Sequence, residues 1–250
     1  MAYLVLIPVL LSLGANFYTP AEKEAALGAQ LAAQTERENT SLGLTAVDQY
    51  VDALGHRLAA QMSRDPLTWT FRVIRDNRGG STCEPISLPG GYVFVPARLI
   101  LAAANEAEFA GMLAHSMAHV AQRHGLQTAN LAIPVIFVGA AGFGDESAVA
   151  PVGYLKYHRQ YELEADQVGT RAIAAAGYDA GALLSFVRRR QQDAGRPEFS
   201  LLPERSVRIA NLEQTIRDLP APQTNVPVGR FDLVQAECRR RIAPVPTLFR

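Results

Sequence analysis

The chain has 250 residues, of which 48% are hydrophobic and 19% are charged. A chain of this length can bury a sizeable core, and it lies at the upper end of the range that one domain usually occupies. Its 24 acidic and 24 basic residues give a formal net charge of zero. This balance argues against nucleic acid as a partner and against attraction to an anionic membrane by global charge, so function is expected to reside in a local site.

The chain begins with an apolar run, MAYLVLIPVLLSLGA, at residues 1–15. The run is shorter than the ~20 residues of a membrane span but has the length of a secretory signal core. Ser12, Gly14 and Ala15 are small enough to form a cleavage site, although no Lys or Arg precedes the run. We therefore expect an exported protein, with retention of the leader as a buried or membrane-associated segment as the alternative.

Two helices and then two strands are predicted in the first hundred residues. Pro20 and Glu22 follow Thr19 as in a helix N-terminus, and the helix should extend to about residue 36. Apolar residues at helical spacing predict a second helix within residues 45–62. The segment 67–75 changes to a period of two, which predicts a strand, and GGYVFVP at residues 90–96 predicts another. A small sheet should therefore precede the next helix.

The second half of the chain is predicted to be helical. Asn105 and Glu108 form a capping-box pattern that begins a helix ending at Gly125. Further helices are expected within residues 153–177, 180–193 and 203–219, after an apolar, Gly-rich segment at 131–144 that lines the core or forms a flap. The chain from about residue 219 is Pro-rich and is expected to be an irregular tail. Residues 16–250 are thus predicted to form a single, mainly α, α+β domain.

Potential metal ligands lie on two of these helices. His115 and His119 are four residues apart in LAHSMAHVAQRHG, so both rings leave one face of a helix and can share one tetrahedral zinc ion. On the next long helix, YELEAD offers Glu162 as a third ligand, with Asp166 one turn further on. Asp166 is placed to accept the second N–H of a ligating histidine. His124, near the expected helix end, fits a structural role in which it interacts with the helix dipole.

Three separated segments together resemble a known family. NEAEFAGMLAHSMAHVAQRHG, with LPGGYVFVPARLI before it and YELEADQVGTRAIAAAGYD after it, is similar to the zinc metallopeptidases that include the CAAX prenyl protease, the mitochondrial inner-membrane stress protease and the periplasmic barrel-assembly-enhancing protease. The likeness spans roughly residues 20–215. It implies a zincin-like fold with a small sheet beside the motif helix and one zinc ion held by His115, His119 and Glu162. The soluble periplasmic members are the closer likeness, which implies a periplasmic or envelope-associated protein.

The resemblance also implies how a substrate would bind. Extended or unfolded polypeptide would lie along the edge of a strand and add itself as a further strand. This substrate strand is predicted to comprise Gly91, Tyr92, Val93, Phe94 and Val95.

The sequence departs from the family pattern at two positions. The family has H-E-x-x-H, whose glutamate takes a proton from the attacking water and passes it to the leaving amine, whereas this chain has Ser116. A serine hydroxyl is a poor base, so peptide hydrolysis should fall by about 10²- to 10⁴-fold. Leu202 stands where the family has a histidine before an arginine-bearing helix, while Arg208 is retained as a candidate catalytic residue. Loss of both polar groups with retention of the ligands favours natural loss of activity.

Three hypotheses follow for this metallopeptidase-like chain. It is a zinc endopeptidase with impaired catalysis, a pseudopeptidase in which structural zinc supports peptide binding as a chaperone or adaptor, or a relic that no longer binds metal. A carboxylate within reach of the attacking water would favour the first hypothesis. Glu106 and Glu108 lie two turns or more before His115, and Glu164 should point away from the face that carries Glu162. On mechanism, the sequence therefore favours the pseudopeptidase.

Overall fold

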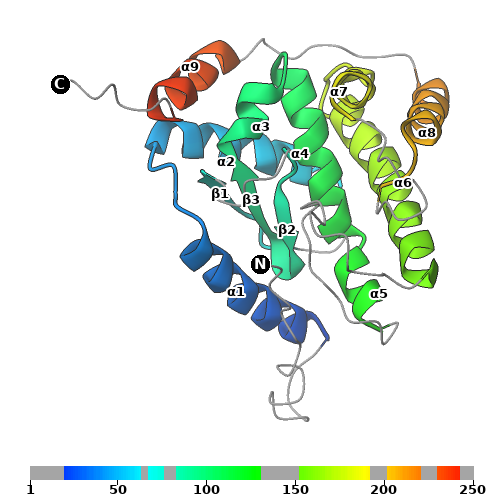
Figure 1. The fold of residues 1–250 in the computed structure, drawn as a ribbon, viewed down its shortest axis with the longest axis horizontal. Helices are drawn as coiled ribbons and strands as arrows, with labels where there is room; N and C mark the ends of the chain where they lie inside the picture. The colour runs from blue at the N-terminus through cyan, green and yellow to red at the C-terminus, as the bar shows by residue number, and fades with distance from the viewer. Residues whose placement is uncertain are drawn as a thin grey trace.

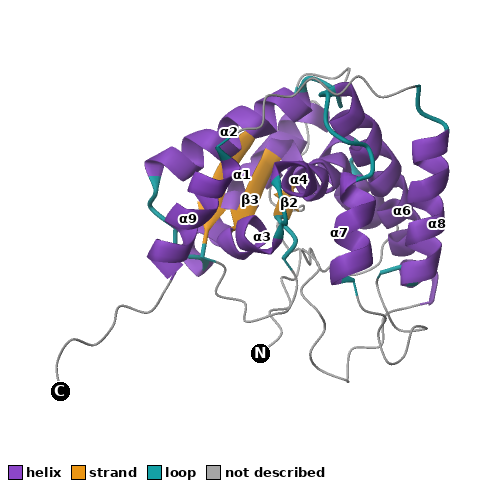
Figure 2. Ribbon diagram, turned by 90° about the horizontal axis from the view of Figure 1, so that it is seen from above, coloured by secondary structure: helices purple, strands orange, loops and turns teal. Residues whose placement is uncertain are grey.

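The computed structural model of the chain describes residues 20–62, 67–75, 83–130, 152–191, 202–220 and 230–242. Helices surround a small three-stranded sheet, as Figures 1 and 2 show. The strands are β1 (Thr70–Ile74), β2 (Ile86–Leu88) and β3 (Tyr92–Pro96), with a short 3₁₀ turn, η2 (Pro89–Gly91), between the last two. The helices are α1 (Pro20–Glu38), α2 (Thr45–Ala59), α3 (Ala97–Ala102), α4 (Glu106–Ala121), α5 (His124–Asn130), α6 (Val152–Ala175), α7 (Ala182–Arg190), α8 (Arg205–Arg217) and α9 (Phe231–Ile242). The prediction of a mainly α, α+β fold with a small sheet is confirmed.

The sheet has the strand order β1-β3-β2, with β3 in the centre. β1 pairs with β3 in parallel, and β2 pairs with β3 in antiparallel orientation. The prediction that residues 91–95 form the exposed edge is therefore wrong: both sides of β3 are paired, and Gly91 belongs to η2. The outer strand on the side of α4 is β2, a three-residue strand between Pro85 and Pro89 that sequence periodicity did not detect.

Helix α4 lies at the centre of the helical layer and is buried on almost all sides. It packs against α6 and α7, and both contacts depend on glycine. A Cβ atom at Gly169 of α6 would lie 2.8 Å from the backbone nitrogen of His115, and one at Gly111 would lie 3.1 Å from Leu183 on α7. These close approaches bring the residues of α6 directly against the histidine-bearing face of α4.

The two ends of α4 are fixed in different ways. Asn105 caps its N-terminus, because its Oδ1 accepts a hydrogen bond from the backbone N–H of Glu108 at 2.9 Å, as the capping-box pattern predicted. The C-terminus differs from the prediction: α4 ends at Ala121, and Arg123 adopts a left-handed conformation with φ 54°. The chain then turns into α5, so His124 begins a new helix instead of ending α4.

The C-terminal part of the chain is more ordered in structure than its composition predicted. Residues 231–242 form α9, so the prediction of an irregular tail from about residue 219 is wrong for this segment. The buried residues Phe231, Val234 and Cys238 recur at helical spacing, and α9 packs on α2 and α3. Contact with the core thus stabilises a helix whose remaining residues are mostly charged.

Two further expectations concern parts of the chain outside this description. The leader at residues 1–15 and the apolar segment at 131–144 lie outside the described residues. Among the helices that the structure describes, none combines the length and the apolar character needed to cross a membrane.

Cys83 and Cys238 are both buried and both free thiols, so the structure contains no disulfide between them.

Candidate active site

The two histidines of α4 project from one face of the helix toward α6. Their Nε2 atoms lie 3.4 Å apart, and their rings are nearly perpendicular. The side chain of His115 is 3% exposed, whereas that of His119 is 23% exposed. The site is therefore closed around His115 and more open around His119.

Helix α6 brings Glu162 to both histidines. Its Oε2 lies 3.4 Å from Nε2 of His115, and its Oε1 lies 3.4 Å from Nε2 of His119. Ligand atoms that surround zinc tetrahedrally at about 2.0–2.1 Å are about 3.4 Å from one another. Among the described residues, Glu162 Oε2 is buried without a hydrogen-bond partner, which is costly unless a cation satisfies it. The three predicted ligands therefore fit one zinc ion.

Asp166 and Arg208 support this cluster on the side of His115. Asp166 Oδ1 lies 2.9 Å from Nδ1 of His115, the ring nitrogen that faces away from the ligand cluster. Arg208 of α8 donates two hydrogen bonds to the Asp166 carboxylate, at 2.7 and 2.8 Å, and a third to Gln191 at 3.0 Å. With 2% exposure, Arg208 is committed to holding Asp166. The structure thus gives it a supporting contact instead of the direct catalytic contact considered from sequence.

The pKa values of the two histidines are shifted in opposite directions. Burial lowers the pKa of His115, but interactions with the carboxylates of Asp166 and Glu162 outweigh it and raise that pKa to about 9. Burial lowers the pKa of His119 to about 3, because the negative charge of Glu162 does not compensate for it. Burial also disfavours the charged form of Asp166, yet Arg208 and His115 hold the pKa of Asp166 below its usual value. Since a ligating imidazole must be neutral at the nitrogen that binds, metal binding would displace a proton from His115.

A second set of polar residues surrounds His119. His124 Nδ1 lies 3.1 Å from His119 Nδ1, and His158 Nδ1 lies 3.8 Å from Glu162 Oε1. The expectation that His124 interacts favourably with a helix C-terminus is wrong, because it is the first residue of α5. Burial lowers the pKa of His124. The position of His124 depends on the left-handed conformation of Arg123, which no sequence pattern indicated.

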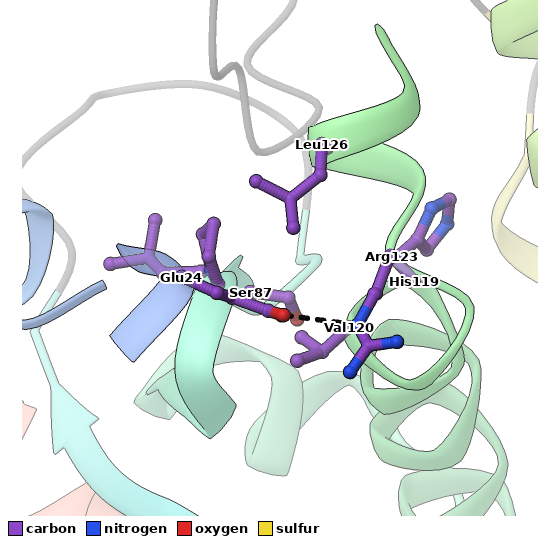
Figure 3. Close-up of a pocket in the computed structure, with 9 residues that line it drawn as sticks. Glu24, Ser87, His119, Val120, Arg123 and Leu126 are labelled. Carbon is purple, nitrogen blue, oxygen red and sulfur yellow. Dashed lines mark hydrogen bonds and ion pairs between the residues drawn. The ribbon is translucent and has the colours of Figure 1, made fainter. Parts of the chain in front are cut away.

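A pocket opens beside His119, between α1, the β2–η2 segment and the α4–α5 junction (Figure 3). Its walls are largely apolar, with Leu88, Pro89, Val120 and Leu126, and an ion pair between Arg123 Nε and Glu24 Oε2 at 3.0 Å closes one side. Ser87 of β2 also lines it. The pocket therefore adjoins both a candidate metal ligand and the outer strand of the sheet.

Comparison with known protein families matches this site to one of them. The sequence model of peptidase family M48 matches residues 45–216, which include both histidines, Glu162, Asp166 and Arg208. The chain belongs to peptidase family M48. The metallopeptidase resemblance seen in its three motifs is thereby confirmed.

Individual relatives agree with the M48 assignment. The chain is 31% identical over 222 residues to the putative beta-barrel assembly-enhancing protease of Vibrio cholerae, covering 80% of this chain and 45% of the relative. It is 26% identical over 159 residues to the beta-barrel assembly-enhancing protease of Yersinia pestis, covering 56% and 32%. A mitochondrial metalloendopeptidase OMA1 of Schizosaccharomyces pombe is 27% identical over 178 residues, covering 66% and 52%. The chain thus spans about a third to a half of the length of these curated relatives.

Within this M48 site, the two departures from the family pattern occupy different environments. Ser116 is 4% exposed and lies on α4 next to His115. Leu202 is partly buried and lies just before α8, followed by Pro203, whose carbonyl accepts a hydrogen bond from Gln191 at 2.9 Å. Neither residue carries a side-chain group that accepts a proton near neutral pH.

Three nearby glutamates are candidate substitutes for the missing base. Glu106 accepts a hydrogen bond from Tyr178 at 2.5 Å, and Glu108 is paired with Arg189. Glu164, 44% exposed, lies 3.5 Å from Nε2 of His124. Glu106 and Glu108 are therefore engaged with residues outside the ligand cluster, and Glu164 contacts His124.

The pKa of one carboxylate that the sequence did not single out is affected by the charges of the site. Glu84 is partly buried on the segment that leads into β2. Burial and the negative charge of Glu162 raise the pKa of Glu84 to about 7, while His115 and Arg208 oppose the increase. It does not belong to the group of potential ligands found among the described residues. No periodicity or motif spacing indicated this position.

Proposed function

We propose that this M48 chain is a zinc-binding protein of the cell envelope that holds extended or unfolded polypeptide and hydrolyses it poorly. The observation that carries the proposal is a complete His115, His119 and Glu162 ligand set beside a serine at the position of the base. His115, His119 and Glu162 would hold one zinc ion, which as a Lewis acid polarises the carbonyl of a peptide bond.

The residues of the chain support the proposal of poor hydrolysis. Peptide cleavage requires a group that removes a proton from the attacking water and delivers it to the leaving nitrogen. Ser116 donates and accepts hydrogen bonds, but its hydroxyl does not take up a proton near neutral pH. The proposed rate deficit is therefore about 10²- to 10⁴-fold relative to an enzyme with the glutamate.

Polypeptide binding is proposed at the outer strand β2. Within the described part of the chain, no strand pairs with the outer side of β2, and an extended peptide can add to such an edge through backbone hydrogen bonds. Ser87 Oγ of β2 is buried without a partner among these residues, and the adjoining pocket offers an apolar wall for a side chain. This location replaces the predicted substrate strand at residues 91–95, whose backbone pairs with its neighbours.

The cellular setting is part of the same proposal. The apolar leader favours export, and relatives bear the name beta-barrel assembly-enhancing protease, which indicates an envelope context. We infer an unfolded envelope protein as the client and peripheral association of the chain with the membrane.

The test compares the wild type with Ser116→Glu and with Ser116→Gln, which has the same size but no basicity. Bound zinc is measured by elemental analysis, and cleavage is measured on fluorescently labelled casein. All three proteins should contain about one zinc ion per chain, and only Ser116→Glu should gain at least about 10²-fold in cleavage rate. A wild type that cleaves as fast as Ser116→Glu would overturn the proposal of impaired hydrolysis, and a lack of zinc in all three would refute the ligand assignment.

Glu84 favours a second candidate function, slow zinc-dependent endopeptidase activity. A carboxylate whose pKa lies near the working pH is suited to general base catalysis, and the pKa of Glu84 responds to burial and to the charges of Glu162 and His115. If Glu84 supplies the base, Glu84→Gln abolishes the residual cleavage by the wild type and leaves bound zinc unchanged. The same substitution in the Ser116→Glu background should then have little effect, because the restored glutamate takes over the proton transfer.

A further inference from the structure

His124 is a buried histidine outside the predicted ligand set, and the turn before it directs its ring toward the site. With 3% exposure it is almost as buried as His115. The left-handed backbone at Arg123 interrupts the helix between α4 and α5, and His124, the first residue of α5, lies with its ring centroid 5.0 Å from that of His119. A continuous helix through residue 124, as the sequence predicted, would have carried this side chain to a different face, because residues five apart differ by about 140° around a helix.

The ring of His124 is fixed on three sides. Its Nδ1 lies 3.1 Å from Nδ1 of His119, with ring centroids 5.0 Å apart and planes at 80°. Its face stacks on Tyr161 at 4.5 Å between centroids and 17° between planes. Its Nε2 lies 3.5 Å from Oε2 of Glu164. These contacts connect α6 with α5 through the imidazole of His124.

The positions of the protons follow from the ligand geometry. Nε2 of His119 faces Glu162 and the ligand cluster, so a neutral His119 that ligates through Nε2 carries its proton on Nδ1. The Nδ1 atom of His124 must then accept that proton's hydrogen bond, since two N–H groups cannot face each other at 3.1 Å. The proton of a neutral His124 is consequently on Nε2, directed toward Glu164.

We propose that His124 is a positioning residue of the metal site, which accepts a hydrogen bond at Nδ1 from Nδ1–H of His119 and holds the His119 ring with Nε2 toward the metal. This arrangement corresponds on the His119 side to the contact that Asp166 makes on the His115 side, with a neutral ring in place of a carboxylate. Partners of this kind orient a ligand and raise its basicity, and their loss typically weakens metal affinity 10- to 100-fold. The inference rests on the proposed zinc site.

Two substitutions separate this role from simple packing. His124→Phe keeps an aromatic ring on Tyr161 but removes the acceptor, whereas His124→Asn loses the stacking and retains an acceptor oxygen at the place of Nδ1. Zinc affinity is measured for the full chain by competition with a chromophoric chelator, and the melting temperature is measured on the metal-free proteins. We expect His124→Phe to bind zinc about 10- to 100-fold more weakly than the wild type and His124→Asn to remain close to it. The melting temperatures should fall in the opposite order, with His124→Asn the lower.

The result that overturns the inference is a zinc affinity that follows the melting temperature, with His124→Phe at least as tight as His124→Asn. Equal affinities for the two variants and the wild type would overturn it as well, while leaving the zinc site intact. A wild type without measurable zinc affinity would refute the proposed site and this inference together. The Co²⁺-substituted wild type and variants provide a second readout, because the visible spectrum reports a change in the orientation of His119 independently of cleavage.

Discussion

The two candidate histidine ligands occupy the same face of one helix, yet a charged pair supports one of them and an imidazole ring contacts the other. On the His115 side, Asp166 and Arg208 form a fully buried ion pair that involves α6 and α8. On the His119 side, the neutral ring of His124 takes the equivalent place, and a pocket lies next to it. Opposite shifts in pKa follow, upward for His115 and downward for His119. The difference leaves the His115 side closed by a buried ion pair and the His119 side next to a pocket.

The largest expected effect is loss of stability on the His115 side. Asp166→Asn removes the negative charge that compensates Arg208, which is 2% exposed. Leaving one charge of a buried pair without its partner costs about 3–5 kcal/mol, so the free energy of unfolding should fall by about that amount. Urea unfolding of the metal-free protein measures the change. A loss below about 1 kcal/mol would mean that water reaches Arg208 and that this side is not closed.

A double variant separates the role of the pair in stability from its role at the metal. Asp166→Leu combined with Arg208→Met replaces the pair by apolar groups, which often restores stability. Zinc affinity should nevertheless stay reduced, because His115 Nδ1 has lost its acceptor.

In acid, the wild type should lose stability through Asp166. The pKa of Asp166 is depressed in the folded state, so the contribution of Asp166 to stability is complete above its unfolded-state pKa and disappears as pH falls through its folded-state pKa.

A smaller effect is expected where α6 approaches α4. Gly169→Ala places a Cβ atom 2.8 Å from the backbone nitrogen of His115 and should force the helices apart, at a cost of about 1–3 kcal/mol. Because α6 carries Glu162 and Asp166, zinc affinity should fall as well. Gly111→Ala is the matched control, since its Cβ would meet Leu183 at 3.1 Å on α7, a helix that carries no candidate ligand. It should destabilise the protein without a comparable loss of zinc affinity, and equal losses in both variants would show that affinity only follows global stability.

The difference between the two sides also marks the limit of what the sequence predicts. Helical periodicity suffices to place His115 and His119 on one face of a helix, and it does the same for Glu162 and Asp166. That the two faces meet at one site was implied by the family resemblance. His124 could not be placed in the same way, since its position depends on the left-handed conformation of Arg123. The side chain of Arg123 is in turn paired with Glu24 of α1, a contact between residues far apart in the sequence. Local patterns therefore predicted the cluster of potential ligands and Asp166 beside it, but neither the pairing of Asp166 with Arg208 nor the contact of His124 with His119.

The same limit applies to the sheet and to the C-terminus. The period of two in residues 67–75 predicted β1, whereas β2 is too short to show a period and exists through pairing with β3. The central position of β3 depends on that pairing, so the choice of substrate strand was wrong. In α9, three buried residues among many charged ones form a helix by packing on α2 and α3, and a tertiary contact of this kind leaves only a weak local pattern.

The smallest expected effect lies at the outer end of the His119 side. Glu164→Gln removes a charge that lies 3.5 Å from His124 Nε2 and is 44% exposed, where solvent screening keeps such contacts near 0.5 kcal/mol or less. Stability and zinc affinity should both stay close to wild type, since the amide oxygen of the substituted side chain could still accept a hydrogen bond from Nε2–H. Chelator competition and urea unfolding of this variant, measured beside Asp166→Asn, compare the two sides directly. A loss as large as that of Asp166→Asn would mean that His119 also depends on a buried charge, and the contrast between the two sides would not hold.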